Sequence, residues 1–423
     1  MLNLALGLFA LIYVLLLVFA NYRSWIALAS AVVFVAVGIL PAGEVFGAID
    51  WNVLMMIAGT MGTVALFIES QMPALLADII MEKVPNVKWA IVALSLFAGI
   101  ISAFVDNVAT VLMVAPVALA VCKKLEVSPV SVIISIAVSS NLQGAATLVG
   151  DTTSILLGGY ADMNFLDFFW YAGRPGMFFV VQLGAIVSTF VLLYLFRDYT
   201  QTIAPMKRTE VSDYFPSVLM VGTVVLLIVA SFIPEKPTVT NGVICMILFV
   251  IGLVKEIAAK GDVKLLGRYM REIDHQTLLL LAGLFVVIAG IREVGVVDLI
   301  AELFVRVSGD NIFLIYTLIV WASVIISAFI DNIPYVATML PVVAGISTLI
   351  GVEPHLLYFA LLTGATLGGN LTPIGASANI TGIGILRKEG NEVSTGDFMK
   401  IGIPFTMAAV ISGYIAVWLF WGM

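Results

Sequence analysis

The sequence predicts an all-α polytopic membrane protein built from two inverted-topology repeats, and three observations lead to this prediction. Hydrophobic residues make up 61% of the 423 residues and charged residues only 11%, whereas a soluble domain has about 25% charged residues. The motif Ser-Ala-Phe-Val-Asp-Asn at 102-107 returns as Ser-Ala-Phe-Ile-Asp-Asn at 327-332. Lysine and arginine gather on alternate loops. A soluble fold could not bury this much apolar chain, so the protein is expected to lie in a lipid bilayer.

The repeat extends beyond the motif. The spacing that separates Ser102 from Ser327 also takes Pro116 to Pro341, Thr147 to Thr372 and Gly150 to Gly375. A spacing shorter by one residue takes Asp50 to Asp274 and Gly59 to Gly283. Matched Gly, Pro, Thr and Asp-Asn residues are improbable by chance in an apolar sequence, so we infer an ancient duplication.

Apolar runs long enough to cross ~30 Å of hydrocarbon predict the spans. They lie near 3-20, 25-41, 52-70, 129-158, 172-196, 215-233, 239-257, 276-292, 354-386 and 402-421.

Two further apolar stretches, 89-122 and 312-350, are interrupted by Asp106-Asn107 and Asp331-Asn332 without a polar loop. Each is predicted to be a re-entrant helical hairpin with Asp-Asn at its tip. An arm such as 89-105 covers about 25 Å at ~1.5 Å per residue, so the tip should lie well inside the bilayer. The alternative of two full spans stays open.

Five spans and one hairpin in each half leave an odd number of crossings between matched residues, so the second half should run upside down. The predicted domains are the first inverted repeat 1-196 (hairpin 89-122, broken helix 129-158), a cytoplasmic linker 197-214, and the second repeat 215-423 (hairpin 312-350, broken helix 354-386). With the loops on alternate sides, sixteen of the 20 Lys and Arg residues, Arg23 among them, fall on one side. Positive charge favours the cytoplasm, which predicts a multi-pass protein of the cell (inner) membrane with both termini outside.

The span after each hairpin is rich in Gly, Pro and hydroxyl residues at 139-154 and 368-379, which is typical of a broken helix. Half-helix termini in such a break offer amides to anions, and unwound carbonyls and hydroxyls offer oxygen ligands to Na⁺. The doubled break therefore predicts a binding site near the middle of the membrane, between the halves.

Three carboxylates, on Asp106, Asp151 and Asp331, fall where the bilayer should be, and burying one costs roughly 2.5 to 3.5 kcal/mol. Each is a candidate proton carrier or cation ligand, although the two tip aspartates could instead cap the following helices. Na⁺ is a candidate occupant at Asp106, Asn107, Asp331 and Asn332. The complete predicted substrate and ion site is Asp106, Asn107, Thr110, Asn141, Gly144, Thr147, Asp151, Thr152, Asp331, Asn332, Asn370, Thr372, Ser377 and Asn379.

Several functions are not expected from this sequence. Neither hairpin core and neither break contains Arg, Lys or His, so an anion would depend on amides, helix dipoles and a bound cation. No phosphate loop, nucleotide fingerprint, HExxH or GxSxG motif is present, which argues against an enzyme and against a cofactor other than a coupling ion, H⁺ or Na⁺. The net charge of −7 is spread over loops, so nucleic acid is not an expected partner.

The sequence resembles the ion transporter superfamily, and within it the group of arsenite permeases, NhaD-type antiporters and P proteins, also called citrate-transporter-like permeases. The resemblance rests on Ser-Ala-Phe-Val-Asp-Asn-Val-Ala-Thr-Val at 102-111, on Pro116, and on Gly-x-x-Thr-x-x-Gly at 144-150 and 369-375. It implies an elevator-type carrier, usually a homodimer, whose moving part here would be 89-160 and 312-386. The dicarboxylate branch has Ser-Asn-Thr at its tips, whereas this chain has acidic tips and has Tyr335 in the place that matches Thr110.

The resulting expectation is a secondary active transporter that moves an inorganic ion or small oxyacid, such as arsenite or antimonite, coupled to H⁺ or Na⁺. A Na⁺/H⁺ antiporter and a citrate or dicarboxylate carrier are the alternatives, and an ion channel is an alternative of another class. If arsenite is the substrate, a soluble ATPase could dock on the cytoplasmic loops, although the sequence carries no mark of it.

Overall fold

The computed structural model describes residues 1–125, 127–202, 208–309 and 311–422. Helices dominate these residues, and the one sheet found among them is the short hairpin β1 (Trp170–Tyr171) and β2 (Arg174–Pro175). Six of the described helices are long and apolar enough to cross a membrane, and a bent pair could make a seventh span. The prediction of an all-α polytopic membrane protein is therefore confirmed. Part of the predicted linker 197-214, namely 203–207, lies outside the described residues.

The first half contains ten helices of the described chain. They are α1 (Leu2–Val18), α2 (Arg23–Ala36), α3 (Val45–Ala48), α4 (Trp51–Glu69), α5 (Met72–Met81), α6 (Val87–Ser102), α7 (Asn107–Leu125), α8 (Val130–Gly144), α9 (Thr152–Tyr160) and α10 (Met177–Leu195).

The second half contains ten more within the described residues. They are α11 (Phe215–Ser231), α12 (Thr240–Lys260), α13 (Lys264–Glu272), α14 (His275–Glu293), α15 (Val296–Ser308), α16 (Ile312–Ser327), α17 (Asn332–Ile350), α18 (His355–Leu362), α19 (Ser377–Lys388) and α20 (Thr395–Trp421). A π-helical turn (Thr363–Leu367) and a 3-10 turn (Gly369–Leu371) follow α18.

Several helix bounds differ from the apolar runs. The run 25-41 is helical only to Ala36, because the chain turns at Gly38 with a φ of 76°. The final helix begins at Thr395, before the run 402-421, because the Ser394 side chain accepts a hydrogen bond from the amide of Asp397 and caps it. Helices α5, α13 and α15 lie where the sequence analysis expected no span.

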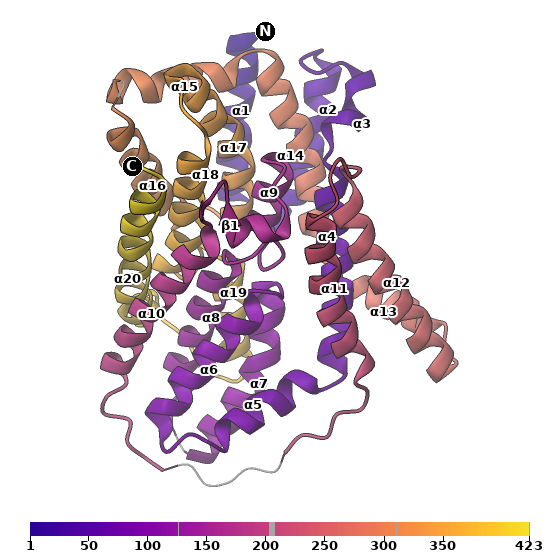
Figure 1. Ribbon diagram of the computed structural model, residues 1–423, viewed down its shortest axis with the longest axis vertical. Helices are drawn as coiled ribbons and strands as arrows, with labels where there is room; N and C mark the ends of the chain where they lie inside the picture. The colour runs from indigo at the N-terminus through magenta and orange to yellow at the C-terminus, as the bar shows by residue number, and fades with distance from the viewer. Residues whose placement is uncertain (126, 203–207, 310, 423) are drawn as a thin grey trace.

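The two interrupted stretches form helix pairs at different levels of the molecule. Hairpin 1 is α6 and α7, and hairpin 2 is α16 and α17. Figure 1 shows hairpin 1 in the lower half and α17 in the upper half, with α8 below α9 and α18 above α19. The inversion of the second half remains a prediction.

The remaining helices pack in two similar crossings. A Cβ added to Gly59 of α4 would lie 2.4 Å from the carbonyl carbon of Cys245 of α12. A Cβ added to Gly283 of α14 would lie 2.5 Å from the carbonyl carbon of Ala27 of α2. Both glycines permit backbone contact that no side chain could allow, and they occupy matched positions in the two halves.

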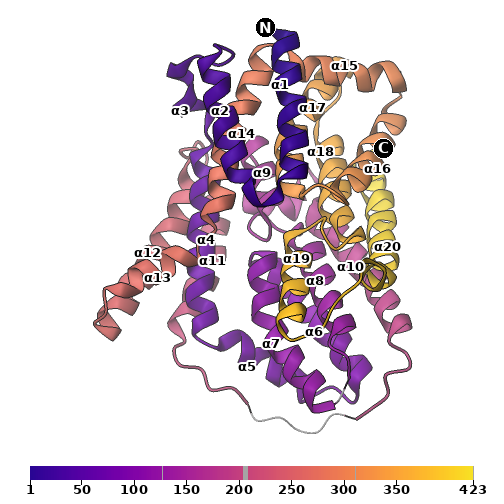
Figure 2. The same cartoon turned by 180° about the vertical axis from the view of Figure 1, so that it is seen from behind.

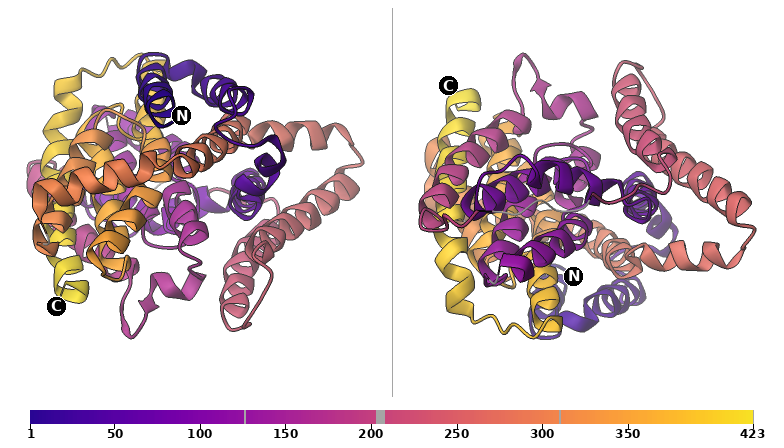
Figure 3. Two further views of the ribbon diagram at one scale, coloured as in Figure 1. Left: turned by 90° about the horizontal axis from the view of Figure 1, so that it is seen from above. Right: turned by 90° about the horizontal axis from the view of Figure 1, so that it is seen from below.

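The outer helices place one turn close to the centre of the molecule. Figure 2 shows α1 running from the top to mid-height, where the chain turns and α2 returns upward. The views along the long axis in Figure 3 show α12 and α13, in pink, standing to one side of the rest. The α1–α2 turn therefore lies near the level at which the two hairpins meet.

Candidate functional site

Each broken helix is fastened to the hairpin before it by a threonine. The hydroxyl of Thr147 donates to the carbonyl of Ala103, and that of Thr372 donates to the carbonyl of Ala328. Both threonines are buried, so these bonds fix the break against the end of the first hairpin arm. The two matched threonines serve the same structural purpose in both halves.

Matched glycines lie beside these threonines. A Cβ on Gly150 would be 2.6 Å from the carbonyl oxygen of Gly144, and one on Gly375 would be 2.5 Å from that of Gly369. Neighbouring hairpin carbonyls are also within 3 Å of both positions. Only glycine allows the unwound backbone to approach the hairpin this closely.

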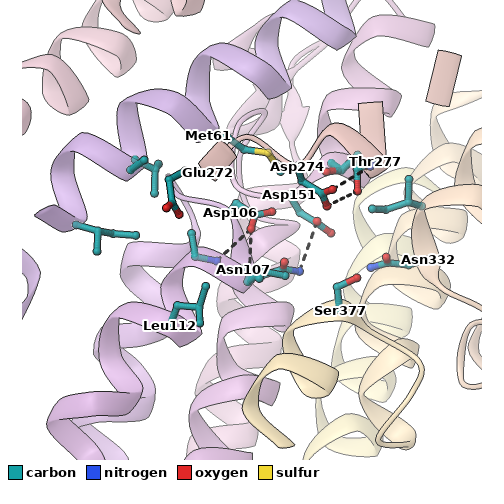
Figure 4. Close-up of a pocket in the computed structure, with 17 residues that line it drawn as sticks. Met61, Asp106, Asn107, Leu112, Asp151, Glu272, Asp274, Thr277, Asn332 and Ser377 are labelled. Carbon is teal, nitrogen blue, oxygen red and sulfur yellow. Dashed lines mark hydrogen bonds between the residues drawn. The ribbon is translucent and has the colours of Figure 1, made fainter. Parts of the chain in front are cut away.

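A small pocket of about 130 Å³ lies where the two tips approach each other (Figure 4). Six predicted site residues line it: Asp106, Asn107, Asp151, Thr152, Asn332 and Ser377. The outer helices contribute Met61 and Val64 of α4, Glu272 at the end of α13, and Asp274 and Thr277 at the start of α14. The pocket thus combines both tips, both breaks and two outer helices.

The first tip presents a carboxylate that is only partly satisfied. Asp106 Oδ1 accepts from the amides of Val108 and Ala109 at 3.0 and 3.2 Å, which caps α7. Its Oδ2 has no hydrogen-bond partner within the described part of the chain. The capping alternative and an ion-binding role are therefore compatible, because each uses a different oxygen.

Asn107 connects this tip to the first break. Its side-chain amide donates to Asn141 Oδ1 at 3.0 Å and faces Asp151 Oδ1 at 3.5 Å. Asp151 Oδ2 accepts from the Thr153 hydroxyl at 2.8 Å. Asp151 is 3% exposed, and no lysine or arginine of the described residues forms an ion pair with it. The first tip and break therefore hold two carboxylates without a countercharge.

The second tip has a countercharge. Asp331 Oδ2 lies 3.2 Å from the guanidinium Nη1 of Arg23 and 3.0 Å from the hydroxyl of Ser377. Its Oδ1 accepts from the Ile333 amide at 3.1 Å and caps α17. Arg23 belongs to the α1–α2 turn, and its Nε donates to the carbonyl of Leu16 at 3.2 Å, so the guanidinium is held from both sides.

The other predicted residues support the pocket and do not line it. Asn141 donates to the carbonyl of Thr366, and Asn370 donates to the carbonyl of Val138, so each amide joins the two breaks. The remaining members of this supporting group are Thr110, Gly144, Thr147, Asp331, Thr372 and Asn379. Thr147, Thr372 and Asn379 donate to backbone carbonyls of the hairpins and breaks, whereas Asp331 also binds the Arg23 and Ser377 side chains.

Sequence reasoning missed Arg23, Glu272, Asp274 and Thr277. Asp274 accepts hydrogen bonds from the amide and the hydroxyl of Thr277 at 3.1 and 2.7 Å and caps α14. The match between Asp274 and Asp50 could have predicted this cap, because a repeated Asp before an apolar run marks a helix start. The role of Arg23 could not be predicted from the sequence, because Arg23 was only one of many charged residues assigned to loops.

Charge in the pocket is one-sided. The ionisable residues of its described lining are Asp106, Asp151, Glu272 and Asp274, all carboxylic acids. Among the described residues, no three His, Cys, Asp or Glu side chains are placed to hold a metal ion together. The lining therefore places carboxylic acids beside the side-chain amides of Asn107 and Asn332.

A second, much larger cavity has a volume of about 1390 Å³. On one side it is lined by Asp50 and Asn52 of α4 and Arg292 of α14, and on the other by Tyr160 of α9 and Leu340 of α17. It thus separates the outer helices α4 and α14 from the hairpin and break helices.

Comparisons with known proteins agree with this fold. The family model described as Citrate transporter matches residues 13–364. An uncharacterized transporter of Mycobacterium tuberculosis is 30% identical over 98% of this chain and 97% of its own length. The human P protein is 26% identical over 86% of this chain and 53% of its own length.

A solved structure, that of the YdaH transporter of Alcanivorax borkumensis, matches with a TM-score of 0.62. The match covers 95% of this chain and 98% of the other at 14% identity, so it shows a shared fold. The family match and the fold confirm the resemblance seen in the sequence. The chain belongs to the citrate transporter family and is a multi-pass membrane transporter.

Proposed function

We propose that this protein is a secondary active transporter that moves a small inorganic ion or oxyacid, such as arsenite or antimonite, and couples its movement to H⁺ or Na⁺. The observation that carries the proposal is the pocket at the tips, whose ionisable lining residues are carboxylic acids from hairpin 1, the first break, the end of α13 and the start of α14. A buried carboxylate is stable when it is protonated or paired with a cation. Binding and release of one cation at Asp106 and Asp151 would supply the coupling.

The lining also bears on the substrate. A multiply charged anion in a space of about 130 Å³ would meet four carboxylic acids at short range. A neutral oxyacid or a cation avoids that repulsion. A citrate carrier, which the family's description favours, would need bound cations to cancel it.

A Na⁺/H⁺ antiporter is the second candidate, and the same acidic lining favours it. In that case Asp106 and Asp151 would take Na⁺ and protons in turn, and no further substrate would be needed.

The proposed movement is of the elevator type. Hairpins and breaks, 89-160 and 312-386, would slide against the other helices, and the large cavity between α4 and α14 on one side and α9 and α17 on the other supports such a division. The homodimer and a location in the cell membrane with both termini outside belong to the same proposal.

The test uses purified protein in liposomes with an imposed pH gradient and a pH-sensitive dye. Na⁺, Li⁺, arsenite, antimonite and citrate are added in turn, with liposomes containing Asp106→Asn protein as the matched control. Proton release on arsenite or antimonite, absent from the control, supports the oxyacid transporter. Release on Na⁺ or Li⁺ alone supports the antiporter, and a signal equal to that of the Asp106→Asn control contradicts a coupling role for the pocket.

A further inference from the structure

We propose that Arg23 is a tethered cation that fills the ion site of the second hairpin tip, so that only the first tip is open to an exchangeable cation. The inference deepens the proposed function and rests on it for the role of the first tip. It concerns a residue outside both hairpins, on the turn between α1 and α2.

In both tips the aspartate caps the following helix, but its second oxygen has a different partner. In each, one aspartate oxygen caps the following helix, through Val108 and Ala109 at Asp106 and through Ile333 at Asp331. The second oxygen of Asp331 is bound by Arg23 at 3.2 Å. The second oxygen of Asp106 has no partner among the described residues. At the second tip the guanidinium of Arg23 thus occupies the position that a mobile cation would occupy at the first tip.

The surroundings make this pairing stable. The Asp331 and Arg23 side chains are only 9% and 18% exposed, so water screens the pair weakly. Ser377 adds a hydrogen bond to the same oxygen at 3.0 Å, and Leu16 accepts from the other side of the guanidinium. Both ends of the pair are therefore held in place before any ion arrives.

The side chain of Asn332 independently supports a difference in function between the two tips. It lines the pocket, is 3% exposed, and its side-chain nitrogen has no hydrogen-bond partner among the described residues. The matching Asn107 instead donates to Asn141 and faces Asp151. An amide donor suits an anion or an oxyacid and does not coordinate a cation. With Arg23 nearby, the second tip fits the oxygen atoms of the substrate, while the first tip fits the coupling cation.

Arg23 is thus a positioning residue that acts through Asp331. The protein therefore binds one exchangeable cation in this conformation, although it carries two acidic tips. Removing the guanidinium should create a second cation site.

The experiment measures equilibrium binding of radiolabelled guanidinium and Na⁺ to the purified full-length protein. The variants are Arg23→Ala, Arg23→Lys, the double variant Arg23→Ala with Asp331→Asn, and Asp106→Asn. Arg23→Ala is expected to bind one more equivalent of guanidinium than the natural protein, the double variant is expected to lose it, and Arg23→Lys, which keeps the charge, is expected not to gain it. No additional equivalent, or one that persists in the double variant, overturns the inference.

A second variant covers the case in which Arg23→Ala does not fold. Asp331→Asn should leave the affinity for the cation at the first tip within about threefold of that of the natural protein, a change of less than about 0.7 kcal/mol. A protein with two exchangeable sites would instead lose half of its bound cation, which would contradict the inference. Failure of the proposed function is seen separately, because then Asp106→Asn leaves cation binding and flux unchanged.

Discussion

The two hairpin tips have the same sequence core, Ser-Ala-Phe-(Val or Ile)-Asp-Asn, and each tip aspartate caps the following helix, but the tips differ in charge. Asp106 stands beside Asp151 without a basic partner among the described residues, whereas Asp331 is paired with Arg23 at 3.2 Å. The partner of the second tip comes from a different part of the chain. Residues outside a duplicated motif have therefore given its two copies different chemistry.

The comparison separates what the duplication kept from what it changed. The buried threonine bonds and the glycine contacts of the breaks are the same in both halves. The position that holds Asp151 in the first half holds Ala376 in the second. The threonine and glycine contacts are shared, whereas Asp151 and the pairing with Arg23 occur in one half only. This difference is the basis of our proposal that one half binds the coupling ion and the other binds substrate.

The largest functional effect is expected from Asp106→Asn. Loss of one charged ligand, about 1.5–3 kcal/mol, should weaken binding of the coupling cation by about 10- to 100-fold and reduce coupled flux to background. Asp331→Asn is the matched control and should have a much smaller effect on cation affinity, because its carboxylate is already paired with Arg23. Equilibrium binding measures the cation affinity of both variants, and flux in liposomes measures the coupling of Asp106→Asn. Equal losses of cation affinity in the two variants would show that the tips are functionally equivalent.

A large structural effect is expected from Gly150→Ala and Gly375→Ala. The new methyl group would meet carbonyl oxygens at 2.6 and 2.5 Å, and such overpacking costs about 1–3 kcal/mol or more. Thermal unfolding in detergent should show a similar loss for both. If only one of the two destabilises the protein, the breaks do not share their geometry.

A smaller and again equal effect is expected from Thr147→Val and Thr372→Val. Each removes one buried hydrogen bond to a hairpin carbonyl, which should cost about 1–2 kcal/mol of stability. Thr147→Ser and Thr372→Ser keep the hydroxyl and serve as controls. Unfolding temperatures that do not change in the valine variants would mean that the threonines do not fasten the breaks.

The sequence alone predicted the features that depend on local pattern. Apolar runs predicted the helices, and the doubled Asp-Asn and Gly-x-x-Thr-x-x-Gly motifs pointed to residues that lie around one pocket, six of them in its lining. Asp50 and Asp274 were noticed as a matched pair, but the cap that Asp274 makes with Thr277 and its place in the pocket needed coordinates.

What the sequence could not predict are contacts set by the packing of distant helices. Arg23 meets Asp331 because the α1–α2 turn lies at mid-height, and no periodicity links residues so far apart. Helices α5, α13 and α15 were missed because they are shorter than the window that identifies spans. Helix formation depends mainly on the local sequence, whereas the residues that become neighbours across helices are decided by the whole fold.

The most direct test of the difference between the tips is a pair of experimental structures of the protein, one in Na⁺ buffer and one without Na⁺, at a resolution that shows ions and guanidinium orientation. We predict that Arg23 remains bound to Asp331 in both structures and that any ion density lies at Asp106 and Asp151. Ion density at Asp331, with the guanidinium displaced from it, would contradict the account.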